Sequence, residues 1–430
     1  MDLSSFIKIY RGSGENDLVL IYSTLRGTLL QVSRSVADAL QESGLKGPEQ
    51  EILVWLGILV PDAEAEKRQV AGYFDWANAN ARRFTALVTL NQDCNLAAPC
   101  CHENRLCGIE HMSEATADLL VEKILKGPMA TGREVQLEFR GSEALLSIPL
   151  IRRIAGPLRE AAAANGTEFS FNLVTDGSLL TREVVEELLP LGLAGARVNI
   201  DVPADIHNSQ QQFVSSHGNH DVALNNIRQI CELLKVRVMG RFTRENHRRV
   251  PELLDLLEQG GITPDMLQMV QFSPVVPGGE ASGSGAFPSG CACSGEPWQM
   301  EASLQLRGEI LKRGWSTPKP KLADCMVEFE NDLVVARDGS LYKCPAFMGR
   351  DDMKIGSLAG GIEDYRKSHN LDVWKNGTCL GCCYLPLCFG GCRFMQRLRS
   401  GAIDGVDCRK EYFDAVLERI VRQDIEFRRK

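Results

Sequence analysis

The chain lacks the excess of positive charge that a nucleic-acid-binding surface needs, since its 430 residues carry a formal net charge of −8. It also lacks any apolar run that approaches the roughly 18 residues with which a helix spans a membrane. Its first residues, Met-Asp-Leu-Ser-Ser, have neither the basic nor the apolar segment of a secretory signal peptide. These absences predict a cytoplasmic protein that binds no nucleic acid and no membrane.

Cysteine is the residue type that stands out, because the chain has 15 of them while its hydrophobic content of 44% and charged content of 24% are ordinary. Four lie between positions 94 and 107, and all the others except Cys231 lie between 291 and 408. The length allows two or three domains and, with the missing signal peptide, excludes a small secreted disulfide scaffold. The sequence therefore predicts two separate metal-binding regions.

Between the two cysteine-rich regions, strand-like and helix-like segments alternate, which predicts parallel βαβ units. The expected strands are Phe84–Leu90, Val135–Phe139, Glu168–Val174, Arg197–Val202, Val236–Phe242 and Met269–Val276. The expected helices are Ser113–Lys126, Ile148–Ala164, Arg182–Leu189, His220–Leu234 and Val250–Gln259. Active sites of α/β barrels lie on the loops that follow the strands, so we expect functional residues there.

The loop after the first expected strand reads Cys94-Asn-Leu-Ala-Ala98-Pro-Cys100-Cys101. It resembles the cluster loop of the radical S-adenosyl-L-methionine (SAM) enzymes, Cys-x3-Cys-x2-Cys, whose thiolates hold a [4Fe-4S] cluster that binds SAM. Cys94 and Cys101 match the first and third positions, whereas Ala98 stands at the second and cannot ligate iron. Cys100 is the nearest substitute, with Cys107 farther away. The alternatives are a site that has lost its cluster, or free thiols in a reducing cytosol.

Loops after the next three strands are similar to the SAM-binding loops of the same family. Gly141-Ser142-Glu143 resembles Gly-Gly-Glu, Thr175-Asp176-Gly177 resembles Thr-Asn-Gly, and Asn199-Ile-Asp201 resembles Ser-Leu-Asp. Each match alone is weak, because glycine and aspartate end many strands. Together the resemblance implies that SAM binds at Gly141, Ser142, Glu143, Thr175, Asn199 and Asp201, with Glu143 facing its amino group. No residue is singled out as catalytic.

The C-terminal cysteines have a specific spacing. Cys325 is followed by an expected hairpin that turns at Asp338-Gly339 and ends at Cys344. The remaining pattern is Cys-x2-Cys-x5-Cys-x3-Cys with one later cysteine, formed by Cys379, Cys382, Cys388, Cys392 and Cys408. This is similar to the seven-cysteine SPASM extension of radical SAM enzymes, which binds two auxiliary [4Fe-4S] clusters.

The SPASM resemblance implies one cluster on four cysteines, namely Cys379, Cys382, Cys388 and Cys408. It implies a second cluster on Cys325, Cys344 and Cys392, with its fourth iron open or ligated by Cys291 or Cys293. The competing ligand is zinc, since Cys-x2-Cys pairs also build zinc sites. The x5 and x3 spacings and the absence of a nearby histidine disfavour zinc.

Residues 1–80 are expected to form a small α+β module. A hairpin is predicted at Leu18–Tyr22 and Thr28–Val32, and helices at Val36–Glu42 and Pro48–Leu56. The module resembles the winged-helix-like element with which peptide-modifying radical SAM enzymes capture a precursor, although a plain packing domain has the same signature. The predicted division is then 1–80 for this module, 81–290 for the radical SAM core, 291–320 for a bridging segment and 321–430 for the SPASM domain.

The predicted fold is an α/β protein with an open six-stranded (β/α)6 radical SAM barrel. The resemblance implies an enzyme that forms a 5′-deoxyadenosyl radical and modifies a ribosomally made precursor peptide by a thioether, a carbon–carbon crosslink or an oxidation. Its cofactors would be SAM and three [4Fe-4S] clusters, and its reductant a flavodoxin or ferredoxin. Sulfatase-type maturation is disfavoured, because Pro345 stands where such enzymes place an acid after the auxiliary cysteine.

Two other functions stay open. Ala98 favours an iron–sulfur electron-transfer or peptide-carrier protein with an impaired SAM site. A radical SAM enzyme that acts on a small molecule or cofactor fits the same motifs.

Overall fold

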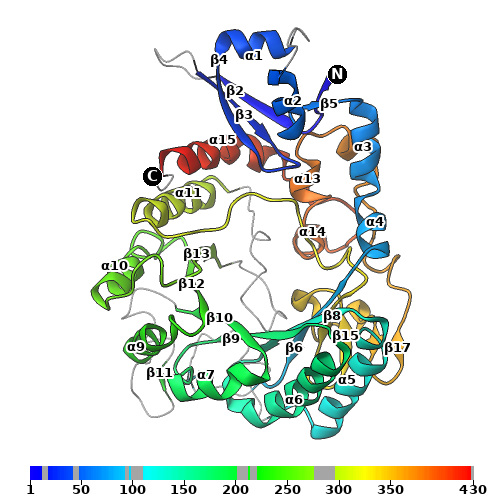
Figure 1. The fold of residues 1–430 in the computed structure, drawn as a ribbon, viewed down its shortest axis with the longest axis vertical. Coiled ribbons are helices and arrows are strands. Elements are labelled where there is room, and N and C mark those ends of the chain that lie inside the picture. The colour runs from blue at the N-terminus through cyan, green and yellow to red at the C-terminus, as the bar shows by residue number, and fades with distance from the viewer. Residues whose placement is uncertain are drawn as a thin grey trace.

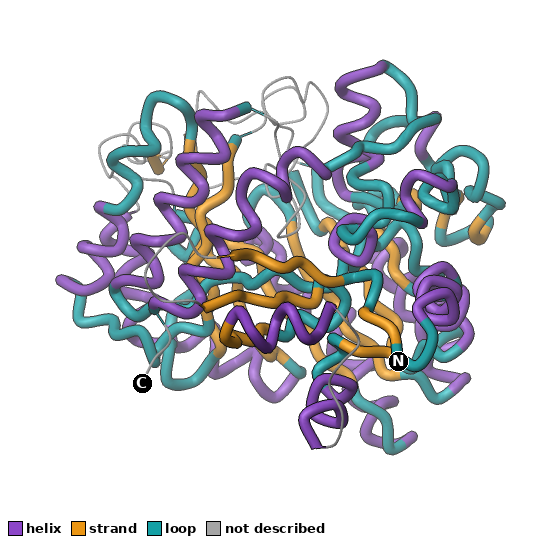
Figure 2. The backbone as a smooth tube through the Cα atoms, turned by 90° about the horizontal axis from the view of Figure 1, so that it is seen from above, coloured by secondary structure: helices purple, strands orange, loops and turns teal. Residues whose placement is uncertain are grey.

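The structure is a computed structural model that describes residues 1–11, 18–41, 48–92, 96–97, 110–200, 212–213, 220–275 and 296–427. A large sheet runs through the middle of the molecule, with helices along its outer side (Figure 1). In the orthogonal view the strands are gathered at the centre and the helices lie around them (Figure 2). None of the helices in the described ranges is both long enough and apolar enough to span a membrane.

The central sheet has the strand order β13-β12-β10-β9-β8-β6-β14-β15-β16-β17. Its first six strands are all parallel to their neighbours: β6 (Arg83–Thr89), β8 (Glu134–Arg140), β9 (Phe169–Thr175), β10 (Leu193–Asn199), β12 (Lys235–Phe242) and β13 (Met269–Pro274). These are the six predicted strands in the predicted order. The fourth begins at Leu193, whereas the sequence predicted Arg197. The small residues Ala194 to Ala196 carry no strand signal, and the pairing with β9 and β12 makes them extended.

The two faces of these six strands differ in polarity, because successive side chains of a strand point to opposite sides. One face is apolar and includes Phe84, Ala86, Val88, Val135, Leu137, Phe139, Phe171, Leu173, Val198 and Val236, each at most 9% exposed. The other face carries Thr85, Gln136, Glu138, Ser170, Asn172 and Arg197. Since the apolar face packs into the main core, the polar face is the one available to a bound molecule.

Helices cover the apolar face. They are α5 (Glu114–Lys126), α6 (Ile148–Asn165), α7 (Arg182–Leu188), α9 (His220–Ile230) and α10 (Glu252–Gln259). The five predicted helices are therefore present, and Ser113 and Thr181 cap two of them through their side chains. Short 3-10 turns are η1 (Met129–Thr131), η2 (Ala144–Ser147), η3 (Leu189–Leu191), η4 (Pro345–Phe347) and η5 (Asp351–Met353), and a separate antiparallel pair is formed by β7 (Leu96–Ala97) and β11 (Gln212–Phe213).

The N-terminal residues form a three-stranded antiparallel sheet of β2 (Ile7–Arg11), β3 (Leu18–Ser23) and β4 (Leu29–Ser33). The predicted hairpin is β3–β4, and the two predicted helices are α1 (Arg34–Gln41) and α2 (Pro48–Trp55). β1 (Asp2–Leu3) pairs with β5 (Leu59–Val60), and α3 (Ala63–Ala71) and α4 (Tyr73–Ala79) lead to the central sheet. The last two helices were not predicted.

The C-terminal region extends the central sheet. Its hairpin of β14 (Asp332–Val335) and β15 (Ser340–Tyr342) turns at Gly339, as predicted, and β14 lies parallel to β6. The remaining elements are α11 (Pro297–Lys312), β16 (Gly356–Ser357), β17 (Gly361–Ile362), α12 (Gly377–Leu380), α13 (Leu385–Cys388), α14 (Arg393–Ser400) and α15 (Lys410–Glu426).

The two ends of the chain pack against each other. Phe6 and Phe74 share one core with Trp374 and Phe389. A second core joins Tyr22 to the C-terminal segment, with Tyr384, Leu387, Phe413, Leu417 and Val421. Figure 1 shows the N-terminal strands at the top of the molecule, directly above α15. The N-terminal module therefore packs against the cysteine-rich region rather than against the six parallel strands.

Candidate functional site

The predicted SAM-binding residues lie at one edge of the sheet. β6, β8, β9 and β10 run parallel in register, so the residues that follow them come out on the same side. The structure brings Gly141 and Glu143 of the loop after β8 next to Thr175 at the end of β9. Asn199 ends β10 at the same edge, and Ser142 is half-buried there, whereas Asp201 lies outside the described residues.

Glu143 is fully buried and its carboxylate connects two loops. One oxygen, Oε1, accepts a hydrogen bond from the backbone N–H of Leu145 at 2.9 Å. The other, Oε2, accepts from the Thr175 hydroxyl and from the backbone N–H of Asp176, both at 2.9 Å. Burial, followed by the nearby charge of Asp176, raises the pKa of Glu143 to about 8. The carboxylate thus lies in a place that favours a cation beside it.

Gly141 is packed against a buried asparagine that the sequence analysis did not single out. A β carbon at position 141 would come within 2.3 Å of Oδ1 of Asn91. Asn91 is fully buried, and its Nδ2 donates to the carbonyl oxygen of Glu143 at 2.8 Å and to the Ser147 hydroxyl at 2.7 Å. Its only sequence signal is a polar residue directly after a buried strand.

The turn after β9 is held by hydrogen bonds with Thr175 at the end of that strand and with Asn226 of α9. The Thr175 hydroxyl accepts from the N–H of Gly177 at 3.0 Å, and Asn226 of α9 donates to the carbonyl oxygens of Gly177 at 2.9 Å and Ser178 at 3.0 Å. Asn199 differs, because its side-chain Oδ1 is buried and has no hydrogen-bond partner among the described residues. A buried acceptor without a donor at this edge indicates a place for a ligand's N–H or O–H group.

The predicted cluster loop starts and ends at this edge. Cys94, Ala98, Cys100 and Cys101 lie outside the described residues, as do Cys107, Cys291 and Cys293. The described residues on either side of the loop are clamped together.

Asn91 forms an antiparallel bridge with His111, and the N–H of Gln92 donates to the carbonyl oxygen of Glu110 at 3.1 Å. Arg337, from the β14–β15 hairpin, donates to Oε1 of Gln92 at 3.1 Å and forms an ion pair with Glu110. We call this clamp the loop neck.

Three of the C-terminal cysteines gather in one group. Cys344 follows β15, Cys392 caps α14, and Cys325 begins a turn in which the N–H of Glu328 donates to its carbonyl oxygen at 3.0 Å. Burial raises the pKa of the Cys344 thiol well above its usual range, and the neighbouring thiols of Cys392 and Cys325 raise it further. The three thiols are therefore close enough to repel each other as thiolates.

The other four cysteines of the SPASM-like pattern gather around α12 and α13, where Cys383, which lies outside the pattern, follows Cys382. Burial raises the pKa of Cys388 to about 12, and the thiols of Cys382 and Cys379 act in the same direction. The pKa of Cys379 is raised by burial and by Cys408 and Cys382. The structure thus brings together the same two groups of cysteines that the resemblance implies. That each group holds a cluster stays a prediction.

Buried cations surround the three-cysteine group. Lys343 is fully buried and Arg393 is 2% exposed, and both directly adjoin a cysteine of the group. Arg140, at the end of β8, is also buried, and its charge lowers the pKa of the Cys344 thiol. Because buried charges need partners, this concentration of cations suits a group with net negative charge.

Across the described residues, no three His, Cys, Asp or Glu side chains are arranged as ligands of a single metal ion. Thiolates that ligate separate irons of a four-iron cluster lie farther apart than the ligands of one ion.

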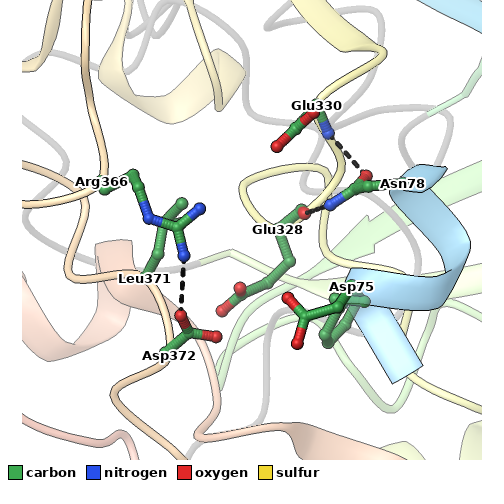
Figure 3. Close-up of a pocket in the computed structure, with 8 residues that line it drawn as sticks. Asp75, Asn78, Glu328, Glu330, Arg366, Leu371 and Asp372 are labelled. Carbon is green, nitrogen blue, oxygen red and sulfur yellow. Dashed lines mark hydrogen bonds and ion pairs between the residues drawn. The ribbon is translucent and has the colours of Figure 1, made fainter. Parts of the chain in front are cut away.

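A small acidic pocket lies at the joint between α4 and the C-terminal region, and Glu328 is among the residues that line it (Figure 3). Asn78 donates to the carbonyl oxygen of Glu328 at 2.9 Å, and the N–H of Glu330 donates back to Asn78 at 2.9 Å. The carboxylates of Asp75 and Asp372 both contact Lys375, which neutralises them. We read this pocket as a structural joint.

No protein-family model matches the chain, and no curated protein matches it in sequence. Among solved structures, the chain shares its fold with radical SAM enzymes. One is anSMEcpe with bound AdoMet and a peptide, at a TM-score of 0.57 and 15% identity over 80% of this chain and 99% of that one. Another is SuiB of Streptococcus suis bound to the precursor peptide SuiA, at a TM-score of 0.52 and 13% identity over 95% of this chain and 98% of that one. At these identities the likeness establishes the fold alone.

Proposed function

We propose that the chain is a radical SAM enzyme that modifies a ribosomally made peptide. The observation that carries the proposal is the edge of the sheet at which Glu143, Thr175 and Asn199 gather beside the loop neck. The similarity to SuiB, a protein solved with a precursor peptide, spans 95% of the chain and so includes the N-terminal and cysteine-rich regions. It supports a peptide rather than a small molecule as substrate.

SAM would bind along this edge, on Gly141, Ser142, Glu143, Thr175, Asn199 and Asp201. The ammonium group of SAM would supply the cation that buried Glu143 favours, and Oδ1 of Asn199 would accept a hydrogen bond from a ligand donor. Gly141 must stay glycine for Asn91 to hold the loop in place. When bound, the cluster and SAM supply the electron and the 5′-deoxyadenosyl radical, which a flavodoxin- or ferredoxin-type reductant would sustain.

The cysteine groups fit iron–sulfur clusters by their donor set. Cys94 and Cys101 would ligate the SAM cluster, with Cys100 as the candidate third ligand in place of Ala98. Two auxiliary [4Fe-4S] clusters would lie on the four-cysteine group and on the three-cysteine group, as the resemblance implies. The donors are all thiols, and the buried cations next to Cys344 and Cys392 would balance the negative charge of a thiolate-bound cluster.

The N-terminal module, residues 1–80, would capture the precursor, and 81–290 would bind SAM inside the open six-stranded barrel. Residues 291–320 would bridge to the SPASM domain, 321–430. The bond formed in the peptide is a thioether, a carbon–carbon crosslink or an oxidation product. Pro345 is buried in η4 after Cys344, so this position offers no carboxylate to a substrate.

The test is formation of 5′-deoxyadenosine from SAM and dithionite by the anaerobically reconstituted chain and by its Ala98→Cys variant. Because alanine cannot ligate iron, we expect the variant to bind about four more irons per chain and to turn over SAM much faster. If the unchanged chain already cleaves SAM at the rate of the variant, Cys100 serves as the third ligand. In that case Cys100→Ala will abolish turnover in the unchanged chain and not in the Ala98→Cys background.

Ala98 also favours a second function, that of an iron–sulfur electron-transfer or peptide-carrier protein. Auxiliary clusters and peptide binding without 5′-deoxyadenosine in either chain would establish this second function and refute the first.

A further inference from the structure

Arg393 directly follows Cys392 and is almost entirely buried, at 2% exposure. Its Nη1 donates to the carbonyl oxygens of Phe389 at 3.2 Å and Gly391 at 3.1 Å, and its Nη2 forms an ion pair with the buried carboxylate of Glu328. The guanidinium is thereby held in one orientation by three fixed acceptors.

The ion pair between Arg393 and Glu328 connects the two backbone segments that carry Cys325 and Cys392. Glu328 closes the turn that begins at Cys325, through its N–H to the carbonyl oxygen of Cys325 at 3.0 Å. Arg393 starts the helix that Cys392 caps. The arginine therefore lies between the two backbone segments that carry Cys325 and Cys392, at the edge of the three-cysteine group.

One donor of the guanidinium has no acceptor among the described residues. The Nε of Arg393 is buried and makes no hydrogen bond to any of them, although Nη1 and Nη2 are both engaged. Such orphaned donors are rare in native proteins and call for an acceptor that belongs to a bound group. The counterpart at the four-cysteine group differs, because Nε of Arg409 donates to Oδ2 of Asp407 at 3.4 Å.

We propose that the Nε–H of Arg393 donates a hydrogen bond to a sulfur of the cluster held by Cys325, Cys344 and Cys392, a cluster that is part of the proposed function. This hydrogen bond raises the reduction potential of that cluster. The physical reason is charge, since reduction adds an electron to an already negative cluster. A cationic donor at its sulfur stabilises the reduced form more than the oxidised form.

The direct test uses the full chain labelled with arginine that carries 15N only in its guanidinium group, reconstituted anaerobically, reduced and examined by pulsed electron paramagnetic resonance. We expect an arginine 15N coupling to one auxiliary cluster, which Arg393→Lys abolishes. Lysine keeps the positive charge and lacks a donor at the Nε position. A Cys379→Ala background, which removes the four-cysteine cluster, shows which cluster carries the coupling.

The second readout is the midpoint potential of each auxiliary cluster. Arg393→Lys should shift the three-cysteine cluster to a more negative potential and leave the four-cysteine cluster unchanged. The matched control is Arg397→Gln, one turn along α14, which removes a cation that pairs with Asp352 at the surface. We expect that control to leave both potentials unchanged.

Glu328→Gln keeps Arg393 and removes its buried countercharge, so it should shift the three-cysteine cluster to a more positive potential. This variant decides the question if Arg393→Lys fails to load iron. A loaded wild-type chain without arginine 15N coupling, or with potentials that neither variant moves, would overturn the inference and leave the proposed function standing. A wild-type chain that binds no iron in its C-terminal region would refute both.

Discussion

At the scale of single residues, the structure shows why a buried carboxylate sits among hydrogen-bond donors at the sheet edge. Glu143 binds three protein donors and still has a pKa raised to about 8, because burial outweighs these hydrogen bonds. A folded-state pKa above the unfolded one means that the folded chain binds the proton more tightly. The stability contributed by this proton is complete below the unfolded pKa and is lost as pH rises through the folded pKa.

We therefore predict that the chain without SAM becomes less resistant to denaturant as pH rises from about 4.5 to about 8. Glu143→Gln should flatten this pH dependence, since glutamine does not titrate. Glu134→Gln, at the half-buried start of β8, the strand that precedes the Glu143 loop, should keep it. The measurement is the urea midpoint of unfolding at several pH values. If the midpoint changes with pH by the same amount in both variants, the prediction is wrong.

SAM should counteract the pH effect. If its ammonium lies beside Glu143, bound SAM lowers the pKa of that carboxyl and stabilises the chain more at pH 8 than at pH 5. Thermal shifts at saturating SAM measure the difference. If the stabilisation by SAM does not change with pH, or if its pH dependence is the same in Glu143→Gln, the ammonium lies elsewhere.

At the scale of elements, the turn between α13 and α14 has a narrow structural requirement. Gly391 has φ of +76° and lies between Cys388 and Cys392, and a β carbon there would come within 2.0 Å of the carbonyl oxygen of Asp407. Asp407 in turn accepts from the N–H of Cys392 at 3.1 Å, so the turn connects the two cysteine groups.

We predict that Gly391→Ala prevents full iron loading of the C-terminal region, because the backbone must move at both Cys388 and Cys392. Gly349→Ala is the matched control: its φ is +75° and its β carbon would meet nothing within 4 Å. We expect the control to lower the unfolding free energy by only roughly 1–2 kcal/mol, the cost of holding a residue with a β carbon in the left-handed conformation. Iron content and unfolding free energy measure both variants, and equal iron in the two would show that the contact with Asp407 is unimportant.

The sequence predicted most helices and strands, because hydrophobic periodicity and turn residues act over a few neighbouring positions. Alternation of strand and helix located all six parallel strands and the five helices that cover them. The contacts that the sequence did not predict are non-local. The pairing of β14 with β6, the contact of Arg337 with the loop neck and the position of Asn91 behind Gly141 join segments far apart in the chain. The grouping of the cysteines came from the family resemblance and not from spacing alone.

At the scale of the whole molecule, the N-terminal module and the cysteine-rich region share cores. Phe74 of α4 is 3% exposed among Phe6, Trp374 and Phe389, with aromatic contacts to Trp374 at 6.0 Å and to Phe389 at 4.8 Å between ring centroids. Deletion of residues 1–80 would therefore expose an aromatic core as well as remove the module proposed to capture the precursor. Point substitutions separate these two effects.

We predict that Phe74→Ala lowers the unfolding free energy by roughly 3–5 kcal/mol, the usual range for a buried phenylalanine. Trp76→Ala, on the same helix and 65% exposed, should change it by less than about 0.5 kcal/mol. Urea unfolding followed by circular dichroism gives both values. A similar loss in the two variants would mean that α4 does not anchor the module.

The loop neck has a consequence for biosynthesis. Its two sides are made early, whereas Arg337, which contacts Gln92 and Glu110, and β14, which pairs with β6, are made late. On the ribosome, where chains grow at about 5–20 residues per second, the neck stays incomplete until the C-terminal hairpin has left the exit tunnel. Iron delivered before that moment meets a loop without its clamp. If this loop holds the SAM cluster, as proposed, we expect the cluster to be inserted only after the C-terminal hairpin has been made.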